Sequence, residues 1–227
     1  MNLISCLNYE ELSTKAAALL IQKIKKVIAQ KGTCVLAIPG GQSIAGIFTL
    51  LKSEKNISWN KVHLFWIDER MVPLTDKDSN YRLAKELFLD ELIQKKKISQ
   101  ENIHPFDFKK GIAVYEQELK KYGGVYDICL FGVGEDGHIA ALFPHHHSLT
   151  DQSPYFLTMK DSPKSPPQRM TTSVSLLRQA ETGIVLFCGK VKQQAFEKFK
   201  DKSTSIEDCP AKLVCEMKER YVFSDLR

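Results

Sequence analysis

Residues 33–51 read TCVLAIPGGQSIAGIFTLL, and this segment is the clearest sign of the fold class. Its first part, 33–38, is a short apolar run of the kind that forms a buried strand. Pro39, Gly40 and Gly41 end that run, and residues 43–51 have the pattern of a helix. A wholly apolar strand that leads straight into a helix is typical of a parallel sheet with both faces covered.

The same alternation continues along the chain. Further apolar runs predict strands at residues 62–67, 126–131 and 183–188. Helical patterns occupy residues 12–28, capped by Asn8 and Glu11, and residues 80–93, 112–122 and 191–199. Residues 151–168 carry four prolines and predict a loop or a short irregular excursion. The sequence therefore predicts one α/β domain over residues 1–227, with a doubly wound, mostly parallel sheet and helices on both faces.

Composition excludes several classes of protein. Of the 227 residues, 43% are hydrophobic and 26% are charged, which is usual for a globular chain and not for a disordered, collagen-like or coiled-coil one. No run approaches the ~18–20 apolar residues of a membrane span, and residues 1–11 do not resemble a signal peptide. We therefore expect a cytoplasmic protein with no membrane partner. The six cysteines form no C-x-x-C pair, so we expect them to be reduced and to act as small apolar residues.

The net charge of +5 slightly favours anionic partners. The basic pairs are spread along the chain without interleaved aromatic residues, so the sequence predicts no nucleic-acid partner. Nothing in the sequence demands more than a monomer.

Polar residues follow the predicted strands at four places. These are residues 40–43, 68–70, 132–138 and 189–192. In open α/β sheets the carboxyl ends of the strands form the ligand site, so we expect these four segments to meet there.

Two of these segments contain glycine-rich turns. Gly40 and Gly41 can let backbone N–H groups approach an anion, or can simply form a tight turn. Residues 132–137 match G-x-G-x-x-G, but a dinucleotide site is not expected, because Pro144 and the histidines that follow interrupt any long helix. Asp136 and His138 better suit general acid/base chemistry, since histidine titrates near neutral pH.

Charged residues complete a candidate anion site. Asp68 and Arg70 end a buried run, where they could form an internal ion pair or bind a substrate. Arg169 and Lys192 add cations near the same sheet edge. The run His145-His146-His147 does not predict a metal site, because consecutive residues cannot easily all ligate one ion and no spaced set completes the ligands.

Taken together, these blocks resemble the 6-phosphogluconolactonase family over about residues 8–222. Residues 36–43 look like its phosphate loop, and residues 65–73 with 79–81 match its most distinctive block. Residues 130–144 match its second signature, and residues 169–171 and 189–192 agree in order and position. The family usually has Ser after the two glycines, where this chain has Gln42 and then Ser43.

The resemblance implies a modified doubly wound, Rossmann-like fold, shared with glucosamine-6-phosphate deaminases and similar to ribose-5-phosphate isomerase. It implies hydrolysis of 6-phospho-D-glucono-1,5-lactone to 6-phosphogluconate, the second step of the oxidative pentose phosphate pathway, with no metal or organic cofactor. His138 would activate water, and Asp68 or Asp136 would orient the water or the imidazole. Backbone N–H groups of residues 132–137 would be candidates for the oxyanion site. The phosphate or sugar would be held by Gly40, Gly41, Ser43, Arg70, Arg169 and Lys192.

Two other functions remain open at this point. A glucosamine-6-phosphate deaminase usually has Tyr where Arg70 stands and Asn-Glu-Pro where this chain has Leu142-Phe143-Pro144. A non-catalytic sugar-phosphate-binding regulator would keep the phosphate loop and lose the acid/base residues, whereas Asp68, Asp136 and His138 are all present.

Overall fold

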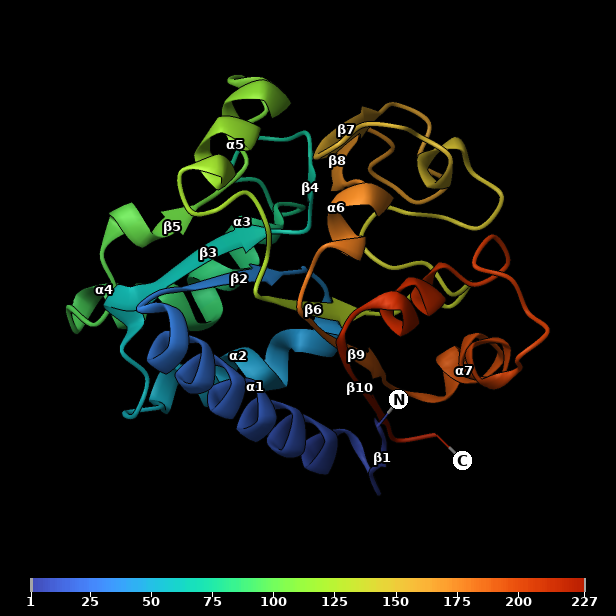
Figure 1. Cartoon of the computed structure of the whole chain (residues 1–227), viewed down its shortest axis with the longest axis horizontal. Coiled ribbons are helices and arrows are strands. Elements are labelled where there is room, and N and C mark those ends of the chain that lie inside the picture. The colour runs from blue at the N-terminus through green and yellow to red at the C-terminus, as the bar shows by residue number, and fades with distance from the viewer. Residues whose placement is uncertain (1, 227) are drawn as a thin grey trace.

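The main sheet is built from parallel strands. The computed structural model describes residues 2–226, and Figure 1 shows a central sheet with helices on both sides. The seven strands lie in the spatial order β1 (Asn2–Ser5), β10 (Glu219–Ser224), β9 (Thr182–Phe187), β6 (Ile128–Gly132), β2 (Cys34–Ile38), β3 (Val62–Trp66) and β5 (Ile103–His104). All of their pairings are parallel.

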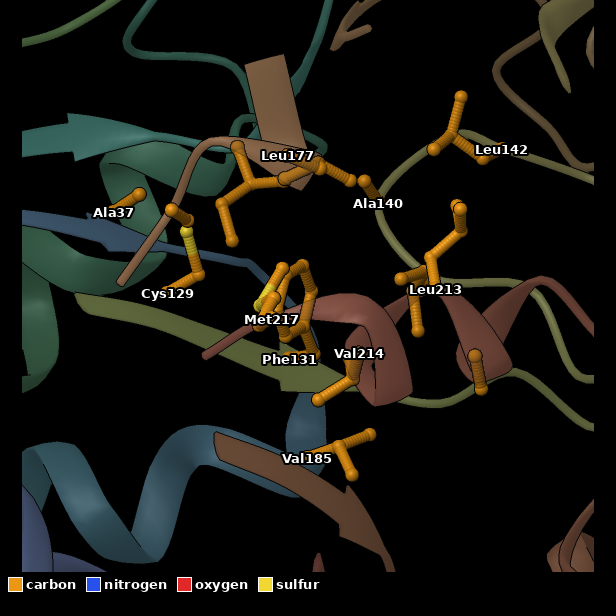
Figure 2. Packing of buried hydrophobic residues seen from close by; sticks show 14 of the residues in the cluster. Ala37, Cys129, Phe131, Ala140, Leu142, Leu177, Val185, Leu213, Val214 and Met217 are labelled. Atoms are coloured by element: carbon orange, nitrogen blue, oxygen red, sulfur yellow. The ribbon is translucent and has the colours of Figure 1, made fainter. Parts of the chain in front are cut away.

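Strand β2 shows why both faces of this sheet must be covered. Every residue of β2 is buried. Because successive side chains point to opposite faces, Val35 and Ala37 enter one hydrophobic core, while Cys34, Leu36 and Ile38 enter the other. Figure 2 shows the first core, where Phe131 and Val185 from the sheet pack near Val214 and Met217.

Helices cover the two faces. The α-helices are α1 (Tyr9–Lys31), α2 (Ala45–Ser53), α3 (Asn80–Ala84), α4 (Asp90–Gln94), α5 (Gly111–Lys120), α6 (Val174–Arg178) and α7 (Gln193–Lys200). The 3₁₀ turns are η1 (Gln42–Ile44), η2 (Trp59–Lys61), η4 (Gln100–Asn102), η5 (His147–Leu149), η6 (Lys190–Lys192) and η7 (Pro210–Glu216), and a π-helical turn, η3 (Lys85–Leu89), joins α3 to α4. Helices α1 and α2 lie together on one side, as Figure 1 shows.

The predicted strands and helices are confirmed to within a few residues. Asn8 caps α1 as expected, since its side chain accepts a hydrogen bond from the Glu11 N–H. In a standard capping box the Glu11 side chain would accept a hydrogen bond from the Asn8 N–H. Here it accepts one from the Leu7 N–H instead, at 2.6 Å.

The prediction of a loop over residues 151–168 is wrong in part. Strand β7 (Phe156–Met159) lies inside it and pairs antiparallel with β8 (Arg169–Thr172), which pairs antiparallel with β4 (Asp68–Arg70). The four prolines flank β7 without interrupting it, so its ladder hydrogen bonds survive. This small second sheet lies next to α6 in Figure 1.

The chain order places a switch point at the centre of the main sheet. From β2 the chain passes to β3 and β5 on one side, then returns to β6 and β9 on the other. The carboxyl ends of β2 and β6 therefore diverge into loops that run in opposite directions, which is where α/β sheets bind ligands. Among residues 2–226, no helix is both long and apolar enough to cross a membrane. Met1 and Arg227, which end the predicted domain, lie outside the described residues.

Candidate active site

A cavity of about 390 Å³ opens above the carboxyl ends of β2, β6 and β9. Its lining includes nearly all residues that the sequence predicted for a site: Gly40, Gly41, Ser43, Asp68, Arg70, His138, Arg169 and Lys192. Asp136 lies behind His138 rather than on the cavity wall. The structure therefore brings the four predicted segments together.

The imidazole of His138 is fixed from behind. Its Nδ1 lies 2.5 Å from Asp136 Oδ1, and the His138 N–H also donates to that oxygen at 3.2 Å. A Cβ built on Gly134 would lie 2.0 Å from His138 Nδ1, so only glycine leaves room for the ring at this point of the loop. With Nδ1–H donating to the carboxylate, the neutral ring keeps Nε2 as its proton acceptor.

Asp136 remains ionised in this arrangement. Burial alone would raise its pKa, but the hydrogen bonds with His138, and the charge of that ring when it is protonated, lower the pKa of Asp136 to about 2. An ionised carboxylate at Nδ1 sets the tautomer of the imidazole and stabilises the imidazolium that forms when Nε2 takes a proton.

The loop that carries these two residues offers fewer free amides than the sequence suggested. The N–H groups of Val133, Gly134 and Gly137 already donate to Leu186, His138 and Gly134 carbonyl oxygens, respectively. Those three groups stabilise the loop, so we exclude them as oxyanion donors.

Two arginines face each other across the small sheet. Arg70 on β4 is directly opposite Arg169 on β8 in the antiparallel register, and both line the cavity. Like charges in this position repel. Asp68 Oδ2, 3.6 Å from Arg169 Nη1, offsets part of that repulsion. A pair of guanidinium groups held together in this way is suited to an anionic ligand.

The protein fixes both guanidinium groups. Arg169 is 4% exposed, and its Nε and Nη2 donate to the carbonyl oxygens of Lys164, Ser165 and Pro166. Arg70 Nη1 donates to Asp78 O at 2.6 Å, while its buried Nε finds no acceptor among residues 2–226. Arg70 therefore keeps unused donor capacity.

Glu69 organises the segment that holds Arg70, a role that the sequence did not reveal. Its wholly buried carboxylate accepts hydrogen bonds from the N–H groups of Arg70, Asn80 and Tyr81 and from the hydroxyl of Ser79. Burial raises the pKa of Glu69 to about 7, although the three backbone donors act in the opposite direction. The Glu69 carboxylate thus joins β4 to the start of α3.

Asn80 is a second residue whose place in the site the sequence did not reveal. Its Nδ2 donates to Asp68 O at 2.9 Å, and it lines the cavity. A Cβ on Gly40 would lie 1.8 Å from Asn80 Oδ1, so Gly40 is needed for the close approach of the two segments.

The loop from Gly41 to Ser43 presents backbone donors to the cavity. Gly41 has φ +91°, and among residues 2–226 no acceptor takes the N–H groups of Gly41, Gln42 or Ser43. The Tyr9 hydroxyl donates to Gln42 O at 3.0 Å and accepts from Gly46 N, so it fixes this loop from outside. Lys192 lies on the 3₁₀ turn η6, which follows β9 as η1 follows β2. This half-buried residue forms no ion pair in the described part of the chain.

The one thiol on the cavity wall is unsuited to nucleophilic attack. Burial raises the pKa of Cys188 to about 12, against a smaller lowering by its hydrogen bond with Ser43. All six cysteines are free. Outside the cavity, the described residues contain one cluster with the ligand types for a metal ion: His146, His147 and Asp161.

Comparisons with known proteins agree with this geometry. Residues 8–223 match the family model described as glucosamine-6-phosphate isomerases/6-phosphogluconolactonase. A 6-phosphogluconolactonase of Borreliella burgdorferi is 32% identical, over 85% of this chain and 83% of that protein. A probable 6-phosphogluconolactonase of Arabidopsis thaliana is also 32% identical, over 83% and 80% of the two chains.

A solved structure shows the same fold. The 6-phosphogluconolactonase of Thermotoga maritima superposes with a TM-score of 0.81 at 23% identity, and the match covers 99% of this chain and 98% of that one. This likeness confirms the predicted fold class. On the match of its sequence to the family model and to its relatives, the chain belongs to the family of glucosamine-6-phosphate isomerases and 6-phosphogluconolactonases.

Proposed function

We propose that this chain hydrolyses 6-phospho-D-glucono-1,5-lactone to 6-phospho-D-gluconate, the second step of the oxidative pentose phosphate pathway. The observation that carries the proposal is the environment of His138. Asp136 holds Nδ1, and the ring of Phe143 packs against the imidazole with 4.7 Å between ring centroids. The site thus has a base for water, and an apolar ring at the position where deaminases have a carboxylate for opening the sugar ring.

Binding of the substrate begins with its phosphate. The opposed guanidinium groups of Arg70 and Arg169, the ammonium of Lys192 and the amides of Gly41 to Ser43 would surround this dianion. Arginine forks and unpaired backbone N–H groups both match phosphate oxygens. The anchored phosphate lets binding energy far from the lactone position the reacting carbon C1.

His138 then acts as base and acid in turn. Nε2 takes a proton from water as its oxygen bonds to C1, and the carbonyl electrons move to the exocyclic oxygen. Collapse of this tetrahedral intermediate restores the carbonyl, breaks the bond from C1 to the ring oxygen, and returns the proton from Nε2 to that oxygen. The new carboxylic acid releases its own proton to solvent. Assistance of this kind contributes ~10²–10⁴-fold to a rate.

Asp136 and Asp68 take different parts in this scheme. Asp136 orients the imidazole through Nδ1, whereas Asp68 lies beside Arg169 and fixes Asn80 through its carbonyl oxygen. His138, and neither aspartate, is therefore the base in our proposal.

The same proposal includes a monomer that works in the cytoplasm. The proposed base and the proposed phosphate ligands are all supplied by a single chain, so the mechanism requires no second copy, and six free thiols suit a reducing compartment. Many basic residues are engaged in ion pairs with acidic neighbours on the surface, which gives no support to a nucleic-acid partner.

The test measures two reactions side by side. The full chain is mixed with fresh lactone near neutral pH, and lactone loss is compared with spontaneous hydrolysis; ammonia release from glucosamine-6-phosphate is followed in parallel. We expect lactone loss far above the spontaneous rate and no ammonia. Ammonia release with lactone decay at the spontaneous rate would instead establish the deaminase, and binding of 6-phosphogluconate without either reaction would establish a regulator.

A further inference from the structure

A cluster of two histidines and an aspartate lies outside the catalytic cavity. His147 Nε2 is 3.1 Å from Asp161 Oδ1, and His146 Nε2 is 3.5 Å from the same oxygen. The ligand atoms of all three residues lie within 4.8 Å of one another. We propose that His146, His147 and Asp161 bind a zinc-class divalent cation, which fastens the segment after β6 to the connection between β7 and β8.

The spacing of the donor atoms matches such an ion. Zinc binds histidine nitrogen and carboxylate oxygen at about 2.0–2.1 Å, so two tetrahedral ligands lie about 3.3 Å apart. The two nitrogen–oxygen separations in the structure, 3.1 and 3.5 Å, lie on either side of this value. A set of two imidazoles and one carboxylate favours zinc and its transition-metal neighbours over magnesium or calcium.

The backbone explains how adjacent histidines can share one ion. His146 is extended, with φ −109° and ψ 145°, and His147 begins the 3₁₀ turn η5. This change of conformation brings the two rings to the same side, with 4.1 Å between their centroids. The third ligand, Asp161, is distant in sequence and approaches from the β7–β8 connection, which the sequence alone could not reveal.

His146 supplies an independent sign that a partner is missing. Its side chain is 14% exposed, and its Nε2 is buried without a hydrogen-bond partner among residues 2–226. Buried polar atoms are nearly always satisfied. A cation at Nε2 would satisfy this atom, and the exposed side of the site, formed by His147 and Asp161, leaves room for water as a further ligand.

The environment of His146 also allows the tautomer that binds a metal. With a cation on Nε2, the proton stays on Nδ1 and can be donated to the Oγ of the fully buried Ser148, 3.0 Å away. Without a metal, Nδ1 can instead accept from the Ser148 N–H at 3.2 Å. Cation binding would therefore select one of two available tautomers.

The two segments that the cation would join both support the catalytic cavity. His146 packs edge-on against Phe143, which also contacts the ring of His138. Asp161 begins the stretch whose carbonyl oxygens, at Lys164, Ser165 and Pro166, hold the Arg169 guanidinium. The proposed ion thus acts on the loop geometry around Arg169, and its binding does not depend on which sugar phosphate the cavity takes.

The experiment titrates the EDTA-treated, dialysed full chain with zinc chloride in a calorimeter. We expect one zinc per chain in the wild type and at least tenfold weaker binding in His147→Ala and Asp161→Asn. Both side chains are more than half exposed, so the variants should remain folded, which thermal unfolding in EDTA checks. His145→Ala is the matched control, because its ring contacts Glu207 and Asp208 instead, and we expect its affinity within threefold of the wild type.

Two further readouts separate this site from other ways of holding zinc. Cobalt(II) should give tetrahedral d–d absorption that Asp161→Asn loses, and zinc should slow amide exchange over residues 160–168. The proposal is overturned by the absence of saturable zinc binding, by equal affinity in all four proteins, by a thiolate-to-cobalt band, or by exchange in residues 160–168 that zinc leaves unchanged.

Discussion

His138 is oriented by the carboxylate behind it. The hydrogen bond from Nδ1 to Asp136 fixes the tautomer, and Gly134, which has no Cβ, leaves the space that the imidazole ring occupies. Aspartate and histidine two residues apart in a glycine-rich turn are visible in the sequence, which is why this pair could be predicted. The different roles of Asp136 and Asp68 could not be predicted. They depend on the fold, which places Asp136 against the His138 imidazole and Asp68 against the Arg169 guanidinium.

The substitution Asp136→Asn tests the orienting role. Asparagine has no charge to stabilise the imidazolium, and its amide can present the wrong group to Nδ1, so we expect kcat to fall about 10²-fold or more, with KM changed less than threefold. Steady-state lactone hydrolysis near neutral pH measures both. Glu135→Gln removes an exposed charge from the preceding residue and serves as the control. Equal kinetics in the two variants would remove Asp136 from the mechanism.

The low pKa of Asp136 also predicts how stability depends on pH. The pKa is about 2 in the fold and ~3.9 in an unfolded chain, so this carboxylate stabilises the fold above about pH 4 and loses that contribution as the pH falls toward 2. We expect the unfolding free energy of the wild type to fall more steeply than that of Asp136→Asn between pH 4 and 2. Urea unfolding at several pH values measures this. Parallel curves for the two proteins would contradict the assignment.

At the scale of elements, the small antiparallel sheet sets the spacing of the two arginines. The register that places Arg70 opposite Arg169 follows from β4 pairing with β8, two segments about a hundred residues apart in the chain. Glu69 then joins β4 to α3. The proposed anion site therefore depends on a strand pairing and on a buried carboxylate, Glu69, that does not line the cavity.

The substitution Glu69→Gln tests the connection that the Glu69 carboxylate makes between β4 and α3. Each oxygen of Glu69 accepts two hydrogen bonds, so the amide group of glutamine must face two donors. We expect the unfolding free energy to fall by about 2 kcal/mol, the cost of leaving buried donors unsatisfied. Glu86→Gln, which breaks an exposed ion pair with Arg82, is the control and should leave the unfolding free energy nearly unchanged. Similar losses in the two variants would contradict the role of Glu69.

Strands with continuous apolar runs could be predicted, and weakly patterned ones could not. Strands β2, β3, β6 and β9 are almost entirely buried, so hydrophobicity alone marks them. The outer strand β1 is mostly exposed, β5 has two residues, and β7 lies among prolines, so each lacks the signal. Their pairings depend on distant partners that a local pattern does not encode.

At the scale of the whole molecule, the cavity is assembled from segments that span residues 39–192. A ligand that contacts several of these segments binds the folded chain and not the unfolded one. Such a ligand stabilises the fold by about 2.7 kcal/mol when its concentration is 100 times its Kd.

We therefore expect 6-phosphogluconate to raise the Tm of the full chain and gluconate at the same concentration to leave it unchanged. The difference isolates the phosphate, which the cationic residues of the cavity are proposed to hold. Thermal unfolding with each ligand measures it. Equal shifts with the two ligands would show that the cavity does not select a phosphate.

In our proposal, His138 activates water for attack on a phosphorylated lactone. The most direct test of this proposal is the rate of 6-phosphogluconolactone hydrolysis above background for the wild type and for His138→Ala, near neutral pH. We expect strong acceleration by the wild type and a loss of ~10²–10⁴-fold in kcat for the variant. Acceleration that survives intact in a folded His138→Ala protein, or none in the folded wild type, would contradict it.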